Sequence, residues 1–148
     1  MIIIGCDPDS AGSGFAFFID GVLKELKLMD LIDFYNTCQK INDSDHDIVE
    51  LHIEDVKSVK GVFQQRVAGK SKPASMMVAQ NVGMCKQVQT EVERIAEHFG
   101  IKIVRHKVSK MWKKDKAQFE KVTGWTGRSN EDTRSAAWFG YLGVTMKR

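Results

Sequence analysis

The alternation of short apolar runs with polar turns is the feature that most constrains how this chain folds. Five runs have the length and composition of buried or half-buried β-strands, namely residues 1–6, 14–19, 22–28, 48–53 and 101–104. Four helices are expected around them: one capped by Asp30 and ending near Cys38, then 75–99, 110–122, and a last one capped by Ser129 or Asn130 and ending near Gly143.

The order of these elements predicts a mixed sheet. Asp20-Gly21 is typical of a tight hairpin turn, so the first three strands are expected to pair antiparallel. The later strand–helix–strand unit implies a parallel, right-handed crossover. We therefore expect one α/β domain over residues 1–148, a mixed five-stranded sheet flanked by helices.

Composition excludes several protein classes. Apolar residues make up 43% and charged residues 28%, which is the balance of a soluble globular protein. The longest apolar run, Phe15–Ile19, is too short to span a membrane, and no signal peptide is expected. The three cysteines form no CxxC pair, so reduced thiols in a cytoplasmic protein are expected rather than zinc ligands or disulfides.

Charge is unevenly distributed along the chain. Residues 1–55 carry 12 acids and 3 bases, whereas residues 56–148 carry 19 bases and 7 acids. The densest basic stretches are 56–73, with five cations and no acid, and 102–116, with seven cations and one acid. Such clustering favours a polyanionic partner such as nucleic acid, with an unpartnered solvated face as the alternative.

Three acids are placed for metal chemistry. Asp7 ends the first strand, Glu54 ends the fourth, and Asp132 lies in the first turn of the last helix, next to Glu131. If the first and fourth strands are neighbours, Asp7 and Glu54 emerge at one sheet edge. Converging carboxylates repel each other unless a cation lies between them. Mg²⁺ prefers such oxygen ligands and supports phosphodiester hydrolysis.

Each acid also has a simpler interpretation. Asp7 before Pro8 suits an ordinary turn, and Glu54 suits a surface charge at a strand end. Asp132 suits a capping box begun by Ser129, and Glu131 suits a solvated charge at a helix amino terminus.

Several segments spread over nearly the whole chain have a characteristic pattern, namely residues 2–15 (IIIGCDPDSAGSGF), 52–56 (HIEDV), 75–83 (SMMVAQNVG), 112–114 (WKK) and 130–137 (NEDTRSAA). In these segments the chain resembles the RuvC-type Holliday-junction resolvases of the RNase H-like superfamily, with phage and poxvirus members most similar. There are two departures: Asp9 stands where the family has glycine, and Ser135 stands where it has a fourth acid.

The resemblance implies a function and its residues. It implies an RNase H-like fold and an endonuclease that uses Mg²⁺, or Mn²⁺ in its place, to nick four-way junctions, flaps or forks as a homodimer. Asp7, Glu54, Asp132 and Glu131 would hold the metal, and Lys113 would neutralise charge at the scissile phosphate. Core packing is the expected role of Trp112.

Residues implied to contact DNA lie in both basic stretches. Phe63 would stack on unpaired bases, with a loop-anchoring role as its alternative. The full set is Lys57, Lys60, Phe63, Arg66, Lys70, Lys72, Lys110, Lys113 and Lys114. Solvated lysine is the alternative for Lys113 and Lys114.

Two other functions remain open at this stage. A junction-binding protein without catalysis would follow if the missing fourth acid were essential. A nucleotide-binding domain related to the actin and sugar-kinase ATPases would also place an acid and glycines after the first strand, but that fold needs a second domain. The resemblance implies the cytoplasm of a bacterial or virus-infected cell as the location.

Overall fold

The computed structural model describes residues 1–59 and 72–148, with the backbone alone for residues 72–75. The strands are β1 (Ile2–Asp7), β2 (Ser13–Ile19), β3 (Val22–Met29), β4 (Val49–Glu54) and β5 (Lys102–His106). The helices are α1 (Leu31–Asn42), α2 (Lys72–His98), α3 (Lys116–Thr123) and α4 (Glu131–Met146), and η1 (Val56–Ser58) is a short 3₁₀ turn.

The five strands form one mixed sheet in the order β3-β2-β1-β4-β5. β1 pairs antiparallel with β2 and parallel with β4, and β5 pairs parallel with β4. Asp20 and Gly21 both have positive φ, at 49° and 85°, as the predicted tight hairpin turn requires. The predicted mixed five-stranded sheet is therefore confirmed.

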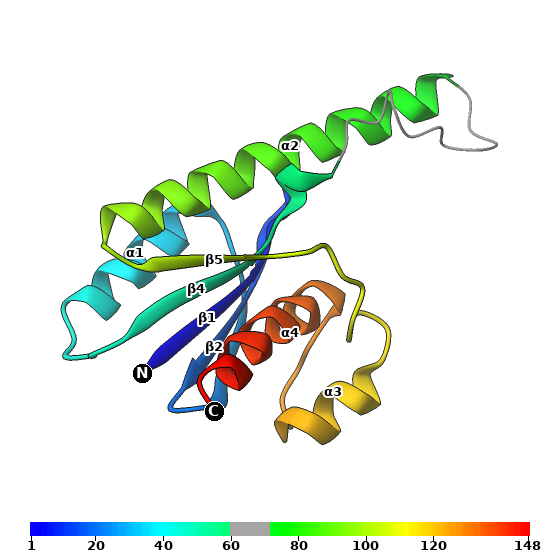
Figure 1. Cartoon of the computed structure of the whole chain (residues 1–148). Helices are drawn as coiled ribbons and strands as arrows, with labels where there is room; N and C mark the ends of the chain where they lie inside the picture. The colour runs from blue at the N-terminus through cyan, green and yellow to red at the C-terminus, as the bar shows by residue number, and fades with distance from the viewer. Residues whose placement is uncertain (60–71) are drawn as a thin grey trace.

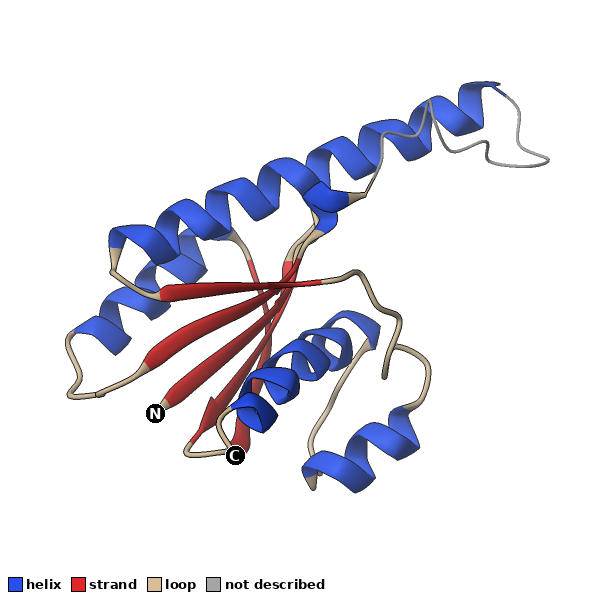
Figure 2. Cartoon of the chain, in the orientation of Figure 1, coloured by secondary structure: helices blue, strands red, loops and turns tan. Residues whose placement is uncertain are grey.

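Helices cover both faces of the sheet (Figures 1 and 2). α1 and α2 pack on one face, where the core contains Phe15, Phe34 and Leu51. α4 packs on the other face with α3 beside it, over a core that includes Ile3, Trp112 and Phe119. The predicted apolar stripe on α2 is confirmed, because its members all belong to the first core: Val88, Val92, Ile95, Ala96 and Phe99.

Several helix boundaries differ from the prediction. α1 continues past Cys38 to Asn42 and α4 past Gly143 to Met146, and two helices begin elsewhere than expected. The basic helix expected over 110–122 begins only at Lys116, because Asp115 caps it and Trp112, with φ of 64°, interrupts the preceding segment. α2 begins at Lys72 rather than at residue 75, since Pro73 is tolerated in the first turn of a helix.

The side chains of β3 do not alternate strictly between buried and exposed. Val22 and Leu28 are about half exposed, whereas Leu23 and Met29 are buried. Phe17 pairs with Glu25 and Phe18 with Leu23, so Lys24 of β3 is left without a partner in a bulge. This bulge shifts the register and changes which β3 side chains face the core.

α4 lies unusually close to the sheet because glycine occupies the contact points. A Cβ at Gly5 would overlap the backbone of Ala136, and a Cβ at Gly14 would overlap the carbonyl of Asp132. These glycines therefore fix how near the amino terminus of α4 comes to the ends of β1 and β2. Among the described residues, no helix is both long and apolar enough to cross a lipid bilayer.

Candidate active site

Asp7 and Glu54 lie side by side at the carboxyl ends of two neighbouring strands, β1 and β4. They are the last residues of β1 and β4, which pair in parallel up to Cys6 and Ile53. Both side chains are nearly inaccessible, with 4% and 5% exposure. The expectation that the first and fourth strands are neighbours is thus confirmed. The two carboxylates lie on the face of the sheet that α4 covers.

The amino terminus of α4 brings Asp132 to the same ends of β1 and β4. Asn130 caps this helix by accepting from Thr133 N at 2.8 Å, and Thr133 Oγ1 accepts from Asn130 N at 3.0 Å. The alternative of a capping box formed by Ser129 and Asp132 is therefore wrong, because the box is made by Asn130 and Thr133. Asp132 is left without a capping role and is half-buried, whereas Glu131 beside it is exposed.

The three carboxylates act on one another electrostatically. Burial, followed by the charge of Asp7, raises the pKa of Glu54 from 4.5 to about 7. Burial also raises the pKa of Asp7, although Lys113 and the Ser135 hydroxyl oppose it and Asp132 adds to it. Each group is thus destabilised as an anion, as expected where carboxylates converge.

Asp9, which replaces the glycine of the RuvC-type pattern, contributes a further negative charge. The pKa of Asp132 is raised by burial first and by Asp9 second, so Asp9 lies near the candidate site. Its side chain also shapes the turn, because Asp9 Oδ1 accepts from Ala11 N at 3.1 Å.

Lys113 is the basic side chain among these acids. Its Nζ lies 3.3 Å from Asp7 Oδ2, and 29% of its side chain is exposed. Burial lowers its pKa, but the charges of Asp7, Glu54 and Asp132 outweigh this and raise it. Lys113 is therefore a firmly protonated cation at the point where the carboxylates meet.

The donor set fits a hard divalent cation in its chemistry. Within the described part of the chain, Asp7 Oδ2 and Ser135 Oγ are the buried side-chain oxygens that complete no hydrogen bond, and the partner of Asp7 Oδ2 is the Lys113 ammonium in an ion pair. Unsatisfied buried oxygens beside three carboxylates suit Mg²⁺, which takes oxygen ligands. Residues 1–59 and 72–148 nevertheless place no three His, Cys, Asp or Glu side chains close enough together to hold an ion in this arrangement.

Ser135 lies beside Asp7. It is one helical turn after Asp132, is 1% exposed, and its hydroxyl lowers the pKa of the Asp7 carboxyl. A hydroxyl therefore faces Asp7 at this position of α4.

The predicted DNA-contacting residues are divided among three regions. Lys110 and Lys114 are exposed in the segment that leads to α3, next to Lys113. Lys72 begins α2, and its side chain is not described. The remaining residues of the second region, Lys60, Phe63, Arg66 and Lys70, lie outside the described residues.

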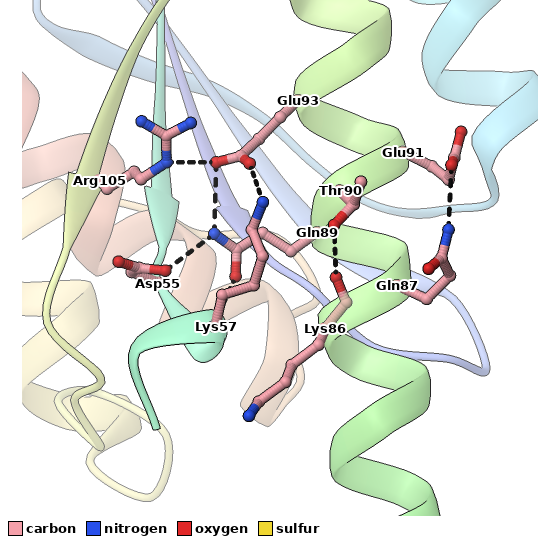
Figure 3. A network of polar contacts seen from close by, with 9 residues as sticks. All are labelled: Asp55, Lys57, Lys86, Gln87, Gln89, Thr90, Glu91, Glu93 and Arg105. Atoms are coloured by element: carbon pink, nitrogen blue, oxygen red, sulfur yellow. Dashed lines mark hydrogen bonds and ion pairs between the residues drawn. The ribbon is translucent and has the colours of Figure 1, made fainter. Parts of the chain in front are cut away.

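The last predicted DNA contact, Lys57, has a protein partner. Its Nζ donates to Glu93 Oε1 at 2.6 Å, and Arg105 Nε donates to Glu93 Oε2 at 2.7 Å (Figure 3). Gln89 joins the same network through Asp55 Oδ1 at 3.0 Å. This cluster ties α2 to η1 and β5, immediately beyond the strand that carries Glu54.

A second buried polar group lies on the α4 face of the sheet. His52 is fully buried between Glu50 Oε1 at 3.0 Å and His106 Nε2 at 2.8 Å, while Lys147 Nζ pairs with Glu50 Oε2 at 2.6 Å. His52 is therefore a hydrogen-bonded core residue, as a lone histidine in a strand usually is. The sequence analysis did not single out Glu50 or His106, because their contacts depend on strand pairing.

Arg134 was also missed, although it is the buried cation of α4. It is 8% exposed, and it donates to the backbone carbonyls of Trp112 and Lys113 and to Ser129 Oγ. An arginine inside an otherwise small and apolar helix segment, TRSAAWFG, was the available signal. The prediction for Trp112 is confirmed, because it is 3% exposed and packs against Phe119.

Comparison with solved protein structures identifies the fold of this chain. The sequence matches no protein-family model, and a search of the curated proteins finds no match. Among solved structures, the chain is similar to Thermus thermophilus RuvC in complex with a Holliday junction substrate. That match has a TM-score of 0.59 and 9% identity over 99% of this chain and 95% of that one. A second Thermus thermophilus RuvC structure matches with a TM-score of 0.53 and 12% identity, over 99% and 96% of the two chains. The protein therefore has a RuvC-like, RNase H-like α/β fold.

Proposed function

We propose that this protein is a metal-dependent endonuclease that resolves Holliday junctions and related branched DNA by hydrolytic nicking. The observation that carries the proposal is the meeting of Asp7, Glu54, Asp132 and Lys113 at the carboxyl edge of β1 and β4. The RuvC-like fold supports it, since one of the similar structures is a RuvC bound to a Holliday junction.

The carboxylates are the proposed metal ligands. Asp7, Glu54 and Asp132, with Glu131 beside them, would hold Mg²⁺ or Mn²⁺. When bound, such an ion activates a water and stabilises the leaving oxygen in phosphodiester hydrolysis. The chain's own contribution is to bury Asp7 and Glu54 and to give them few partners among the described residues. Lys113 is paired with Asp7 at 3.3 Å, and the Ser109 amide is a long donor to Glu54 at 3.5 Å.

Lys113 has a separate proposed role. Its ammonium lies 3.3 Å from Asp7 and balances part of the negative charge of that carboxylate. It would remain beside the acids when a phosphate binds there. A fixed cation at that place stabilises the charge that develops on a phosphate during cleavage.

The basic surface is the proposed DNA contact. Lys110 and Lys114 flank Lys113, and Lys60, Arg66, Lys70 and Lys72 belong to the basic stretch between β4 and α2. Lys57 is also a proposed DNA contact, although its ammonium is paired with Glu93. Phe63 is the residue proposed to stack on unpaired bases. Each lysine or arginine that reaches a phosphate releases counterions and strengthens binding.

Three further parts of the proposal rest on the sequence resemblance. The protein would act as a homodimer, because a four-way junction offers two equivalent cleavage points. Its nearest kin would be the phage and poxvirus members, and it would work in the cytoplasm of a bacterial or virus-infected cell.

A cleavage assay tests the central proposal. Labelled four-way junctions, flaps, forks and linear duplexes are incubated with the protein and Mg²⁺, beside the Asp7→Asn variant. We expect symmetric nicks in the junction, none in the linear duplex, and none with Asp7→Asn, which should still bind junctions. Cleavage by Asp7→Asn at the parental rate would overturn the assignment of the site.

One observation favours a second candidate, a branched-DNA-binding protein that does not cut. Ser135 stands in place of the fourth acid, and no three acids lie within metal-holding distance of one another in the described residues. Junction binding with no cleavage under either Mg²⁺ or Mn²⁺ would select this candidate. If Ser135→Asp restored cleavage, the missing fourth acid would be the cause of the inactivity.

A further inference from the structure

The Lys110–Lys113 turn holds its backbone in a conformation that its sequence does not favour. Lys113 N donates to Lys110 O at 3.3 Å, so Trp112 is the third residue of the turn. Its φ of 64° lies in the left-handed region, where glycine or asparagine is the usual occupant of a turn. A bulky residue remains there only if the surroundings stabilise it.

Part of that stabilisation comes from the indole of Trp112. The side chain is 3% exposed and contacts the rings of Phe119, Trp138 and Tyr141, at centroid distances of 5.6, 5.1 and 5.3 Å. Burial anchors the side chain, but it does not satisfy the backbone carbonyls that the turn leaves outside any helix or strand.

Arg134 satisfies those carbonyls. Its Nε lies 3.0 Å from Trp112 O and 3.2 Å from Lys113 O, and its Nη2 lies 2.6 Å from Lys113 O. Its Nη1 donates to Ser129 Oγ at 3.0 Å, which fixes the guanidinium plane. The planar fork of arginine suits several acceptors at once, and a lysine ammonium does not reproduce it.

The position of Arg134 links two parts of the candidate site. It lies on α4 two residues after Asp132, while the turn it holds carries Lys113 to within 3.3 Å of Asp7. We propose that Arg134 is a positioning residue that clamps the Trp112–Lys113 backbone so that the Lys113 ammonium is held against Asp7. Its kinetic consequence rests on the proposed nuclease function, whereas its structural consequence does not.

The structural consequence is measured by chemical labelling. Lys113 is part-buried and ion-paired, whereas Lys114 beside it is exposed, so an amine-reactive acetylating reagent should label Lys113 more slowly. In Arg134→Lys and Arg134→Met, mass spectrometry should show the Lys113/Lys114 labelling ratio rising toward one. Arg94→Lys, at an exposed arginine of α2, is the matched control and should leave the ratio unchanged. An unchanged ratio in folded Arg134→Lys would overturn the inference.

The kinetic consequence is measured in single turnovers on a four-way junction. Arg134→Lys should slow cleavage by on the order of 10- to 100-fold, as misplacement of a reacting group does, with junction affinity unchanged. In a Lys113→Met background, the same substitution should slow cleavage no further, because Arg134 acts through Lys113. Effects that multiply would show a merely structural role and overturn the inference.

The two proposals fail separately. If the wild-type protein cuts no branched DNA, the proposed nuclease function fails, and the labelling ratio alone decides the role of Arg134. If the wild type cuts but Arg134→Lys cuts equally fast, the positioning role fails and the nuclease function stands. Arg134→Lys keeps the charge of the parent, which guards the experiment against the loss of folding that Arg134→Met could cause.

Discussion

Glu50 and Glu93 are as inaccessible to solvent as Asp7 and Glu54, with 3–5% exposure for all four residues, yet the pKa shifts of the two pairs have opposite signs. Burial raises the pKa of each carboxyl. In Glu93, however, Arg105, Lys57 and Gln89 reverse this, and the net pKa is lowered.

Glu50 follows the same pattern as Glu93. Burial opposes its ionisation, but hydrogen bonds from Lys147 and His52 lower its pKa overall. Asp7 and Glu54 share a single lysine, and their pKa values remain raised. The fold therefore neutralises the charge of Glu50 and Glu93, which link its elements. It compensates the charge of Asp7 and Glu54 at the carboxyl ends of β1 and β4 only in part, which is the pattern expected of a functional site.

The largest expected effect is a loss of activity without a loss of stability on substitution of Asp7, one of the two carboxylates with raised pKa values. Asp7→Asn should lower junction cleavage by roughly 10²–10³-fold or more, as the loss of one preorganised charged group does. Because the pKa of Asp7 is raised, its anion is disfavoured by folding, and the variant should unfold at the same temperature as wild type or higher at pH 8. Gel cleavage and thermal unfolding measure the two effects. If Asp7→Asn still cleaved junctions and unfolded at a lower temperature than wild type, the contrast between the two pairs of carboxylates would be wrong.

The pair Glu50 and Glu93 should respond in the opposite way. Glu93→Gln leaves Lys57 and Arg105 without their buried partner, and we expect a loss of about 2 kcal/mol, because both cations retain access to water. Urea unfolding measures it. Glu91→Gln, two residues earlier on the same helix and in a surface pair with Arg94, is the matched control and should change stability by less than about 0.5 kcal/mol. Equal losses in the two variants would mean that burial of the pair adds nothing.

The pH dependence of stability should distinguish Glu54 from Glu50. The folded protein binds the Glu54 proton more tightly than the unfolded chain, so this group lowers stability as pH rises from about 4.5 to about 7. Glu54→Gln should therefore be more stable than wild type by roughly 1–3 kcal/mol at pH 8 and equal to it below pH 4.5.

Glu50→Gln supplies the contrast. The lowered pKa of Glu50 means that its carboxylate stabilises the fold above its ordinary pKa and that this stability is lost as pH falls through the folded value. The variant should thus be less stable than wild type at pH 7, with the difference closing in acid. Denaturant unfolding of both variants from pH 4 to 8 tests the signs, and the same sign for both would contradict the comparison.

The smallest expected effect is that of Mg²⁺ on unfolding. A cation bound to the folded state alone should raise stability by about 1.4 kcal/mol at ten times its dissociation constant. The gain should vanish on chelation and in Asp7→Asn. It should persist in Glu93→Gln, because Glu93 of the wild type is paired with Lys57 and Arg105 and is not a proposed metal ligand. Thermal unfolding with and without Mg²⁺ measures it. A shift that survives in Asp7→Asn would place the cation elsewhere.

Local signals predicted most of the fold. The apolar runs fixed the strands to within two residues at most ends, and the hairpin at Asp20-Gly21 formed as expected. The exceptions are places where a distant element decides the outcome. The bulge at Lys24 changed which side chains of β3 are buried. The left-handed turn at Trp112 and the Asp115 cap set the start of α3 at Lys116.

The acids of the proposed site could be found from the sequence, but the balance of charge around them could not. Asp7, Glu54 and Asp132 stand at the ends of elements, where a sequence pattern can find them. That Lys57 pairs with Glu93 on α2, or that His106 meets His52, follows from pairings 36 and 54 residues apart in the chain, which no local pattern carries.

The amino-acid sequence by itself determined the class of fold, the order of strands and helices, and the three acids at their ends, because periodicity and turn chemistry are local properties. Only the tertiary structure decided which buried carboxylates are neutralised by cations and which are not. Charge compensation acts over a few ångströms in space, between side chains that the sheet and its helices bring together from distant parts of the chain.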